Sequence, residues 1–255
     1  MIAPNLICSA LVLLFASAEA SADSVVVAVA ANFAAPLAAL EATFEAATQH
    51  ELEVRVGSTG QTYAQIINGA PFDVFLAADQ ERPRLLAERG LADPASRFTY
   101  AEGRLVLWTQ DPKFVDRLAL GLLEGDEFRF LAIASPELAP YGAAAEQTLT
   151  NLGLWDSLQH QNRIVRGQSI AATFAFAATG NAELAFVALA QALSYQKAGA
   201  YLIVPETLYE PIRQDAVVIR HAADNAAVIA FMQFLKSPEA RATIERFGYR
   251  ASDSR

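Results

Sequence analysis

The stretch Gly57–Ile66, Gly-Ser-Thr-Gly-Gln-Thr-Tyr-Ala-Gln-Ile, predicts a strand that ends in a glycine turn and opens directly into a helix. Ser58 and Thr59 are residue types that are preferred at helix N-caps. A helix start leaves about four backbone N–H groups without partners and carries a partial positive charge, so it can hold an anion. A capped helix without a ligand fits the same pattern. The function therefore depends on whether other stretches converge on this one.

Three predicted strands lie on both sides of this stretch, and helical spacing lies between them. They are Val25–Ala30, Leu52–Val56 and Phe72–Ala77. Val25–Ala30 is apolar without polar alternation, as expected of a strand that is buried on both faces of a parallel sheet. Strands that alternate with helices predict an open, doubly wound α/β domain, which binds its ligands at the carboxyl ends of the strands.

The same alternation recurs further along the chain. The further predicted strands are Arg104–Thr109, Phe130–Ala134, Arg163–Val165, Leu184–Leu189 and Ala216–Ile219, and the further predicted helices are Ala143–Leu152, Ile170–Ala178, Asp224–Leu235 and Pro238–Phe247. No flexible linker separates the two parts. We therefore expect two lobes joined by crossing strands, the first from residues 23–102 plus 213–255 and the second from residues 103–212.

The amino terminus predicts export. Residues 1–22 combine an apolar run with the small-residue cleavage pattern Ala20-Ser21-Ala22, as in a secretory signal peptide. Cleavage there would remove Cys8, the only cysteine of the 255 residues, so no disulfide is expected in the mature chain. The net charge of −9 at pH 7 argues against nucleic acid and anionic membrane surfaces as partners.

Four stretches offer helix starts or turns rich in neutral donors. They are Ala30–Phe33, Gly57–Gly60, Pro140–Gly142 and Gln168–Ala171, and none contains Lys, Arg or His. Backbone N–H groups and hydroxyls can hold a fully deprotonated divalent oxyanion, since each charge-assisted hydrogen bond contributes about 1.5–3 kcal/mol. A phosphate that carries a proton would need a carboxylate acceptor, which these stretches lack. The pattern indicates an oxyanion site made of neutral donors.

These residues resemble the periplasmic molybdate-binding proteins of ABC transporters over nearly the whole mature length. The matching pieces are Ala30–Phe33, Gly57–Gly60, Asn68–Asp79, Ala139–Gly142, Thr179–Leu189 and Phe234–Ala240. The resemblance implies a two-lobed type II periplasmic binding protein with its ligand in the cleft between the lobes. It implies a monomer that captures molybdate, and also tungstate, and delivers it to a membrane permease. No enzymatic activity, catalytic residue or cofactor is expected.

The resemblance also implies which residues hold the anion. They are Ala31, Asn32, Ser58, Thr59, Tyr141 and Ile170, with no direct ligand to the metal atom. Tyr141 could use its hydroxyl or its amide, whereas any role of Ile170 belongs to its amide. Ala188 stands where some members carry a tyrosine donor, a loss that Tyr141 could offset.

Two alternatives remain open from the sequence. Another tetrahedral oxyanion, such as sulfate, would suit the same donors, and cavity size would have to discriminate against it. A hydrolase with Ser58 as nucleophile would need a histidine within reach. The chain has His50, His160 and His221, and none lies in the convergent stretches or shows metal-ligand spacing with another.

Overall fold

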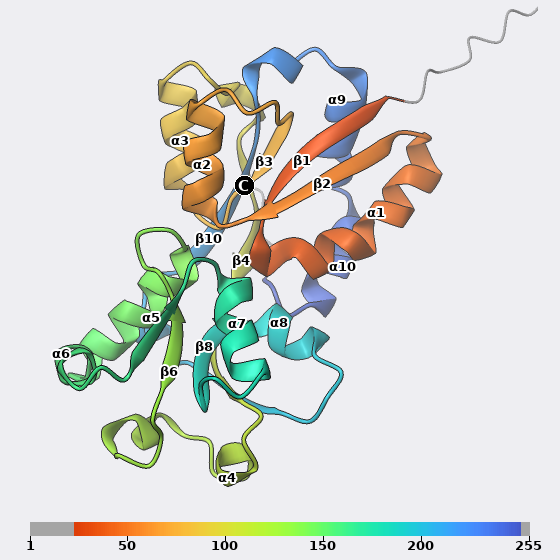
Figure 1. Ribbon diagram of the computed structural model, residues 1–255. Helices are drawn as coiled ribbons and strands as arrows, with labels where there is room; N and C mark the ends of the chain where they lie inside the picture. Colours follow the sequence, from red (N-terminus) through yellow and green to blue (C-terminus); the bar gives the residue numbers. More distant parts are fainter. Residues whose placement is uncertain (1–22, 251–255) are drawn as a thin grey trace, which may run out of the picture.

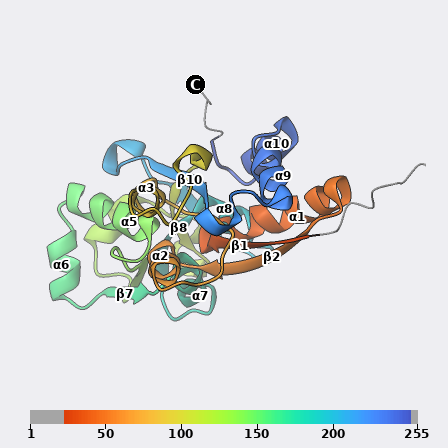
Figure 2. The same cartoon turned by 90° about the horizontal axis from the view of Figure 1, so that it is seen from above.

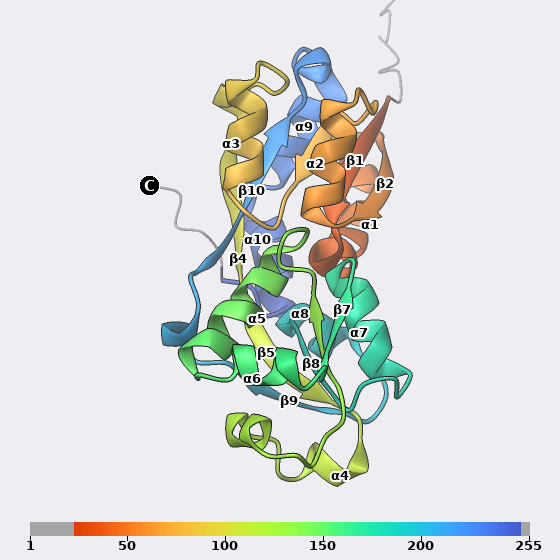
Figure 3. The same ribbon diagram turned by 60° about the vertical axis from the view of Figure 1, so that its left-hand side comes forward.

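The computed structural model describes residues 23–250, so the predicted signal peptide lies outside the described residues. Two mixed sheets of five strands each form two lobes, which are stacked one above the other in Figures 1 and 3. The first lobe has the strand order β2-β1-β3-β10-β4, with β1 (Ser24–Ala30), β2 (Glu51–Gly57), β3 (Val74–Leu76), β4 (Phe98–Gly103) and β10 (Ile212–Val218). The second lobe has the order β7-β6-β8-β5-β9, with β5 (Leu105–Thr109), β6 (Leu131–Ala134), β7 (Ile164–Gly167), β8 (Leu184–Ala188) and β9 (Ala200–Ile203).

Helices cover both faces of the first sheet. Figure 2 shows α1 (Ala34–Thr48), α9 (Ala226–Phe234) and α10 (Pro238–Arg246) on one side of β1 and β2, and α2 (Thr59–Ile67) on the other. The helix α3 (Glu81–Glu88) packs beside α2, and short 3₁₀ turns lie at η1 (Ala31–Phe33), η2 (Pro94–Ser96) and η5 (Arg220–Ala222). The inner strands β1, β3 and β10 are therefore buried from both sides, whereas the edge strand β2 stays largely accessible, with Val56 55% exposed.

The second sheet is covered in the same way. The helices α5 (Pro140–Asn151) and α6 (Trp155–His160) contribute to the core on one face, and α7 (Ile170–Ala178) and α8 (Leu189–Ser194) contribute to the core on the other. The remaining elements are α4 (Pro112–Val115), η3 (Leu120–Glu124) and η4 (Glu206–Leu208). Among residues 23–250, no helix is both long enough and apolar enough to cross a bilayer.

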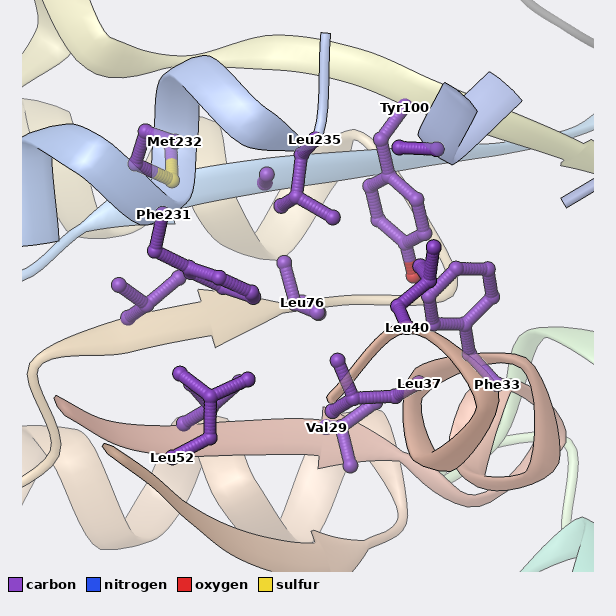
Figure 4. Close-up of a cluster of buried hydrophobic side chains, with 14 of the residues drawn as sticks. Val29, Phe33, Leu37, Leu40, Leu52, Leu76, Tyr100, Phe231, Met232 and Leu235 are labelled. Atoms are coloured by element: carbon purple, nitrogen blue, oxygen red, sulfur yellow. The ribbon is translucent and has the colours of Figure 1, made fainter. Parts of the chain in front are cut away.

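Alternation along each strand divides the apolar residues between the two faces. In β1, Val25, Val27 and Val29 join the core that α1, α9 and α10 cover, while Ala28 joins the core beneath α2 and α3. Figure 4 shows the first of these cores, where Phe33 lies against the ring of Tyr100 with 4.7 Å between ring centroids. This edge-to-face contact places η1, which directly follows β1, close to β4.

The fold class is confirmed, and the differences from the predicted elements have local causes. The strands β4 and β9 were not predicted, because their sequences, Phe-Thr-Tyr-Ala-Glu-Gly and Ala-Tyr-Leu-Ile, are not long apolar runs. The strand β10 starts at Ile212 and runs antiparallel to both β3 and β4. The helix α5 begins at Pro140 rather than at the predicted Ala143, because proline is well suited to the first helical position.

Candidate functional site

Four helical N-termini meet at one small cavity between the lobes. The first lobe contributes η1 and α2, and the second lobe contributes α5 and α7. The lining residues are Ala30, Ala31, Asn32, Ser58, Thr59, Ala78, Ala139, Pro140, Tyr141 and Ile170. All six residues that the sequence nominated are in this set. The structure thus brings together segments more than a hundred residues apart in the chain.

The local sequence explains why unpaired amides point into this cavity. Ser58 is the N-cap of α2, and its Oγ accepts a hydrogen bond from the N–H of Gln61 at 3.3 Å. Ser169 caps α7 in the same way, with 3.2 Å from its Oγ to the nitrogen of Ala172. Thr59 and Ile170 occupy the first helical positions, where the N–H has no intrahelical acceptor. Their amides are therefore free for a guest.

The two hydroxyls of the first lobe are oriented as donors. The Oγ1 of Thr59 accepts from the N–H of Ala78 at 3.0 Å, as the Oγ of Ser58 accepts from Gln61. Each oxygen is already an acceptor, so its own hydrogen remains available to donate. Ser58 and Thr59 are both buried. A guest with acceptor oxygens and no proton of its own suits this pair.

The side chains of Asn32 and Tyr141 are directed to partners behind the cavity. The Nδ2 of Asn32 donates to the Oε1 of Gln214 at 2.9 Å and to the hydroxyl oxygen of Tyr249 at 3.0 Å, which uses both of its hydrogens. The hydroxyl of Tyr141 accepts from the Nε2 of Gln214 at 3.2 Å and lies so close to Gly103 that a Cβ there would be 2.0 Å from it, and neither of these residues lines the cavity. The geometry therefore favours the backbone amides of Asn32 and Tyr141 as donors to a guest.

The cavity has no formal charge on its walls. None of its lining residues is ionisable at neutral pH, so its positive potential comes from helix dipoles and N–H groups. Asp79 follows the lining residue Ala78, and burial raises the pKa of its carboxyl while Arg82 acts in the opposite direction. Arg82 forms an ion pair with Asp79. The acidic group nearest in sequence to the cavity wall is therefore compensated locally.

Direct contacts hold the lobes closed over the cavity. The N–H of Gly60 donates to the carbonyl of Leu138 at 2.8 Å, and the Nη2 of Arg82 donates to the carbonyl of Glu137 at 2.7 Å. Gly60 lies so close to this segment that a Cβ would be 3.0 Å from the Cα of Leu138. The remaining cavity measures about 10 Å³, which is about the space that one water molecule needs, so the lining residues would closely surround any guest.

The histidines lie elsewhere. His50, His160 and His221 are all within the described residues, and none lines the cavity. The Nε2 of His221 lies 3.1 Å from the Oδ1 of Asp73, and the Nδ1 of His160 lies 2.7 Å from the carbonyl oxygen of Asp156. A Ser58-based triad therefore has no histidine in this cavity. Within residues 23–250 no group of three or more His, Cys, Asp or Glu side chains could hold a metal ion.

Sequence reasoning did not find the residues behind the cavity. Tyr100, Gln214 and Tyr249 are buried and hydrogen-bonded to Asn32, to Tyr141 or to each other. Gln214 precedes the run of β10 that was recognised as a strand, and Tyr249 follows the last predicted helix. In the sequence, only a polar residue inside a predicted buried strand could have indicated such a position. Ala188 lies in β8 and does not line the cavity.

An enclosed site between two α/β lobes defines a two-lobed solute-binding protein, and comparison with known proteins agrees. The chain matches the family described as bacterial extracellular solute-binding protein over residues 25–250. The molybdate-binding protein ModA of Azotobacter vinelandii is 48% identical over 232 residues, covering 90% of this chain and 91% of that protein. ModA of Rhodobacter capsulatus is 45% identical over 230 residues, with 90% and 89% covered.

A solved structure extends the agreement to three dimensions. The periplasmic molybdate-binding protein of A. vinelandii superimposes with a TM-score of 0.85 at 42% identity, and the match covers 90% of this chain and 100% of that one. This chain belongs to the bacterial extracellular solute-binding protein family. The resemblance noted from the sequence motifs is confirmed.

Proposed function

We propose that this protein captures molybdate, and also tungstate, and delivers it to the membrane permease of an ABC transporter. The observation that carries the proposal is a small interlobe cavity lined by neutral donors from both lobes. The similarity to proteins named molybdate-binding over nine tenths of the chain supports the same ligand. The role is capture and delivery, with no catalytic step.

The donor chemistry supports a fully deprotonated tetrahedral anion. We assign the hydroxyls of Ser58 and Thr59 and the backbone amides of Asn32, Tyr141 and Ile170 as donors, with Ala31 completing the wall. No lining side chain is a carboxylate that could accept a proton from hydrogen phosphate. A bound carboxylate ligand would ordinarily be paired with Arg, and none lines the cavity. Neither molybdate nor tungstate requires a direct protein ligand to its metal atom here.

The cellular setting follows from the same proposal. Residues 1–22 are a cleaved signal peptide, and the mature protein works in the periplasm as a monomer without a cofactor. Residues 23–102 with 213–255 act as one lobe and residues 103–212 as the other. Closure brings both sets of donors to one anion, because neither lobe alone surrounds it.

Isothermal titration of the mature protein with molybdate, tungstate, sulfate and phosphate tests the proposal. We expect tight one-to-one binding of the first two, and much weaker binding of sulfate because a rigid ring of donors set for a larger ion makes poorer bonds to a smaller one. Equal affinity for sulfate and molybdate would refute the selectivity. No heat with any of the four would refute the oxyanion site.

A further inference from the structure

A cluster of buried polar side chains lies behind the cavity, where the two lobes meet. We call it the hydroxyl–amide network, and its members are Asn32, Tyr100, Tyr141, Gln214 and Tyr249. Each member is at most 5% exposed. Four of them belong to the first lobe or its carboxyl-terminal segment, and Tyr141 alone belongs to the second lobe. The network therefore crosses from one lobe to the other at a single residue.

Gln214 connects Asn32 with Tyr141, and Tyr249 holds Asn32 at two atoms. The Oε1 of Gln214 accepts from Asn32 at 2.9 Å, while the Nε2 of Gln214 donates to the hydroxyl of Tyr141 at 3.2 Å. The hydroxyl of Tyr249 donates to the carbonyl oxygen of Asn32 at 2.8 Å and accepts from the Nδ2 of Asn32 at 3.0 Å. Asn32 is thus held through both its main chain and its side chain.

Tyr249 is itself held in place by the end of the chain. Gly248 ends α10 with a φ of 83°, and a Cβ there would lie 2.6 Å from the Cδ2 of Leu189. Arg250, which follows Tyr249, exchanges two backbone hydrogen bonds of 3.0 Å with Glu102 of β4. The ring of Tyr249 packs edge-on against Phe33, with 5.4 Å between centroids. The tyrosine is therefore a fixed part of the interface between the lobes.

We propose that Tyr249 and Gln214 are positioning residues that hold the Asn32 and Tyr141 amides at one anion in the closed protein. This inference rests on the proposed function. Neither side chain lines the cavity, so each acts through Asn32 and Tyr141. The bond from Gln214 to the hydroxyl of Tyr141 joins the first lobe to the second, so it stabilises the closed arrangement of the lobes in this structure. It therefore adds to the affinity for the anion by stabilising the state that binds it.

The substitution Tyr249→Phe tests the role of the hydroxyl while keeping the ring. It leaves a donor of Asn32 and its carbonyl without their buried partner, so we expect the dissociation constant for molybdate to rise about tenfold. The matched control is Tyr209→Phe, because Tyr209 is also buried and its hydroxyl accepts from Leu105 at 3.2 Å within the second lobe. The control should lose thermal stability without losing affinity. Calorimetric titration and thermal unfolding of the free protein separate the two effects.

A double substitution tests whether the hydroxyls act as one unit. Tyr141→Phe and Tyr249→Phe should be strongly non-additive, because both hydroxyls belong to one chain of hydrogen bonds that runs through Asn32 and Gln214. An affinity loss in the double variant close to that of the larger single variant would support the network. Unchanged molybdate affinity in Tyr249→Phe, with only the free protein destabilised as in Tyr209→Phe, would overturn the positioning role. Failure of the wild-type protein to bind molybdate would overturn the proposed function and this inference together.

Discussion

The two lobes line the cavity with different kinds of group. The first lobe presents the hydroxyl side chains of Ser58 and Thr59, whereas the donors that we propose for the second lobe are main-chain amides at the starts of α5 and α7. Side-chain donors can be removed by substitution, but backbone donors can only be displaced. The comparison suggests that substitutions in the first lobe remove bonds to the anion, while substitutions around the second lobe alter closure.

The largest expected effect comes from a pair of matched N-caps. Ser58→Ala and Ser169→Ala each remove a serine cap from a nine-residue helix, but only Ser58 lines the cavity. Both variants should lose about 1 kcal/mol of stability. Ser58→Ala should also weaken molybdate binding by about one to two orders of magnitude, because it removes a charge-assisted hydrogen bond.

Calorimetric titration of both variants checks this contrast. Ser169→Ala should bind molybdate within about threefold of the wild-type protein, since it loses a cap and no donor. Equal losses of affinity in the two variants would show that helix stability, and not the Ser58 hydroxyl, sets the affinity.

A smaller effect is expected at Arg82, which pairs with Asp79 and bonds the carbonyl of Glu137 across the cleft. Arg82→Ala should weaken molybdate binding about tenfold, since it leaves the carboxylate of Asp79 uncompensated near the anion and removes an interlobe bond. Arg84→Ala is the control, because Arg84 pairs with Glu88 on the exposed side of the same helix.

The effect of Arg82→Ala should also depend on pH. Burial already raises the pKa of Asp79, and loss of the opposing arginine would raise it further. Protonation of Asp79 at lower pH then removes the repulsion, so the affinity of the variant relative to wild type should improve on acidification. A ratio that stays constant with pH would argue against repulsion by Asp79.

A still smaller loss is expected from Gly60→Ala, which tests closure. A Cβ at Gly60 would press on the backbone of Leu138 and force the lobes apart by a few tenths of an ångström. We expect affinity to fall about fivefold, as for the loss of one interlobe hydrogen bond. Gly121→Ala meets open space and serves as the control. A crystal structure of the loaded Gly60→Ala protein should show the backbone of Leu138 displaced from residue 60 relative to the wild type, and an unchanged position would contradict the steric argument.

The last prediction concerns protein stability at alkaline pH, and no change in stability is expected at neutral pH. Burial raises the pKa of Tyr100, Tyr141 and Tyr249 above the ordinary value of 10.0. The folded protein therefore keeps protons that the unfolded chain releases, so this contribution to stability is complete below pH 10 and is lost as pH rises through the raised values. Denaturant unfolding between pH 8 and pH 11, with tyrosinate absorbance recorded in parallel, should show stability falling only above about pH 10. Ionisation of all seven tyrosines before unfolding would contradict it.

Most of the strands could be predicted because their signal is local. The continuous apolar runs of β1, β5 and β6 indicate strands that are buried on both faces of a sheet. The strand β4 could not be predicted in this way, because Thr99 and Glu102 interrupt its apolar character. The helix α5 begins at Pro140, three residues before the predicted start at Ala143, because proline also suits the first position of a helix.

The candidate site was predicted unevenly for a similar reason. The cavity-lining residues follow strands or begin helices, so helix-start motifs and the family resemblance nominate them. The network behind them depends on pairs such as Asn32 with Gln214 and Asn32 with Tyr249, which are 182 and 217 residues apart. No local sequence pattern indicates that two residues so far apart in the chain form a hydrogen bond. The closed arrangement of the lobes is what brings them together.

A crystal structure of the protein grown with molybdate, with the molybdenum located by anomalous scattering, tests the central claim most directly. We expect one molybdenum peak in the cavity lined by Ser58, Thr59, Tyr141 and Ile170. The anion oxygens should lie about 2.7–3.0 Å from the two hydroxyls and the main-chain nitrogens, with no protein atom bound to the metal. A molybdenum peak elsewhere on the molecule, or an anion held by charged side chains, would contradict the account.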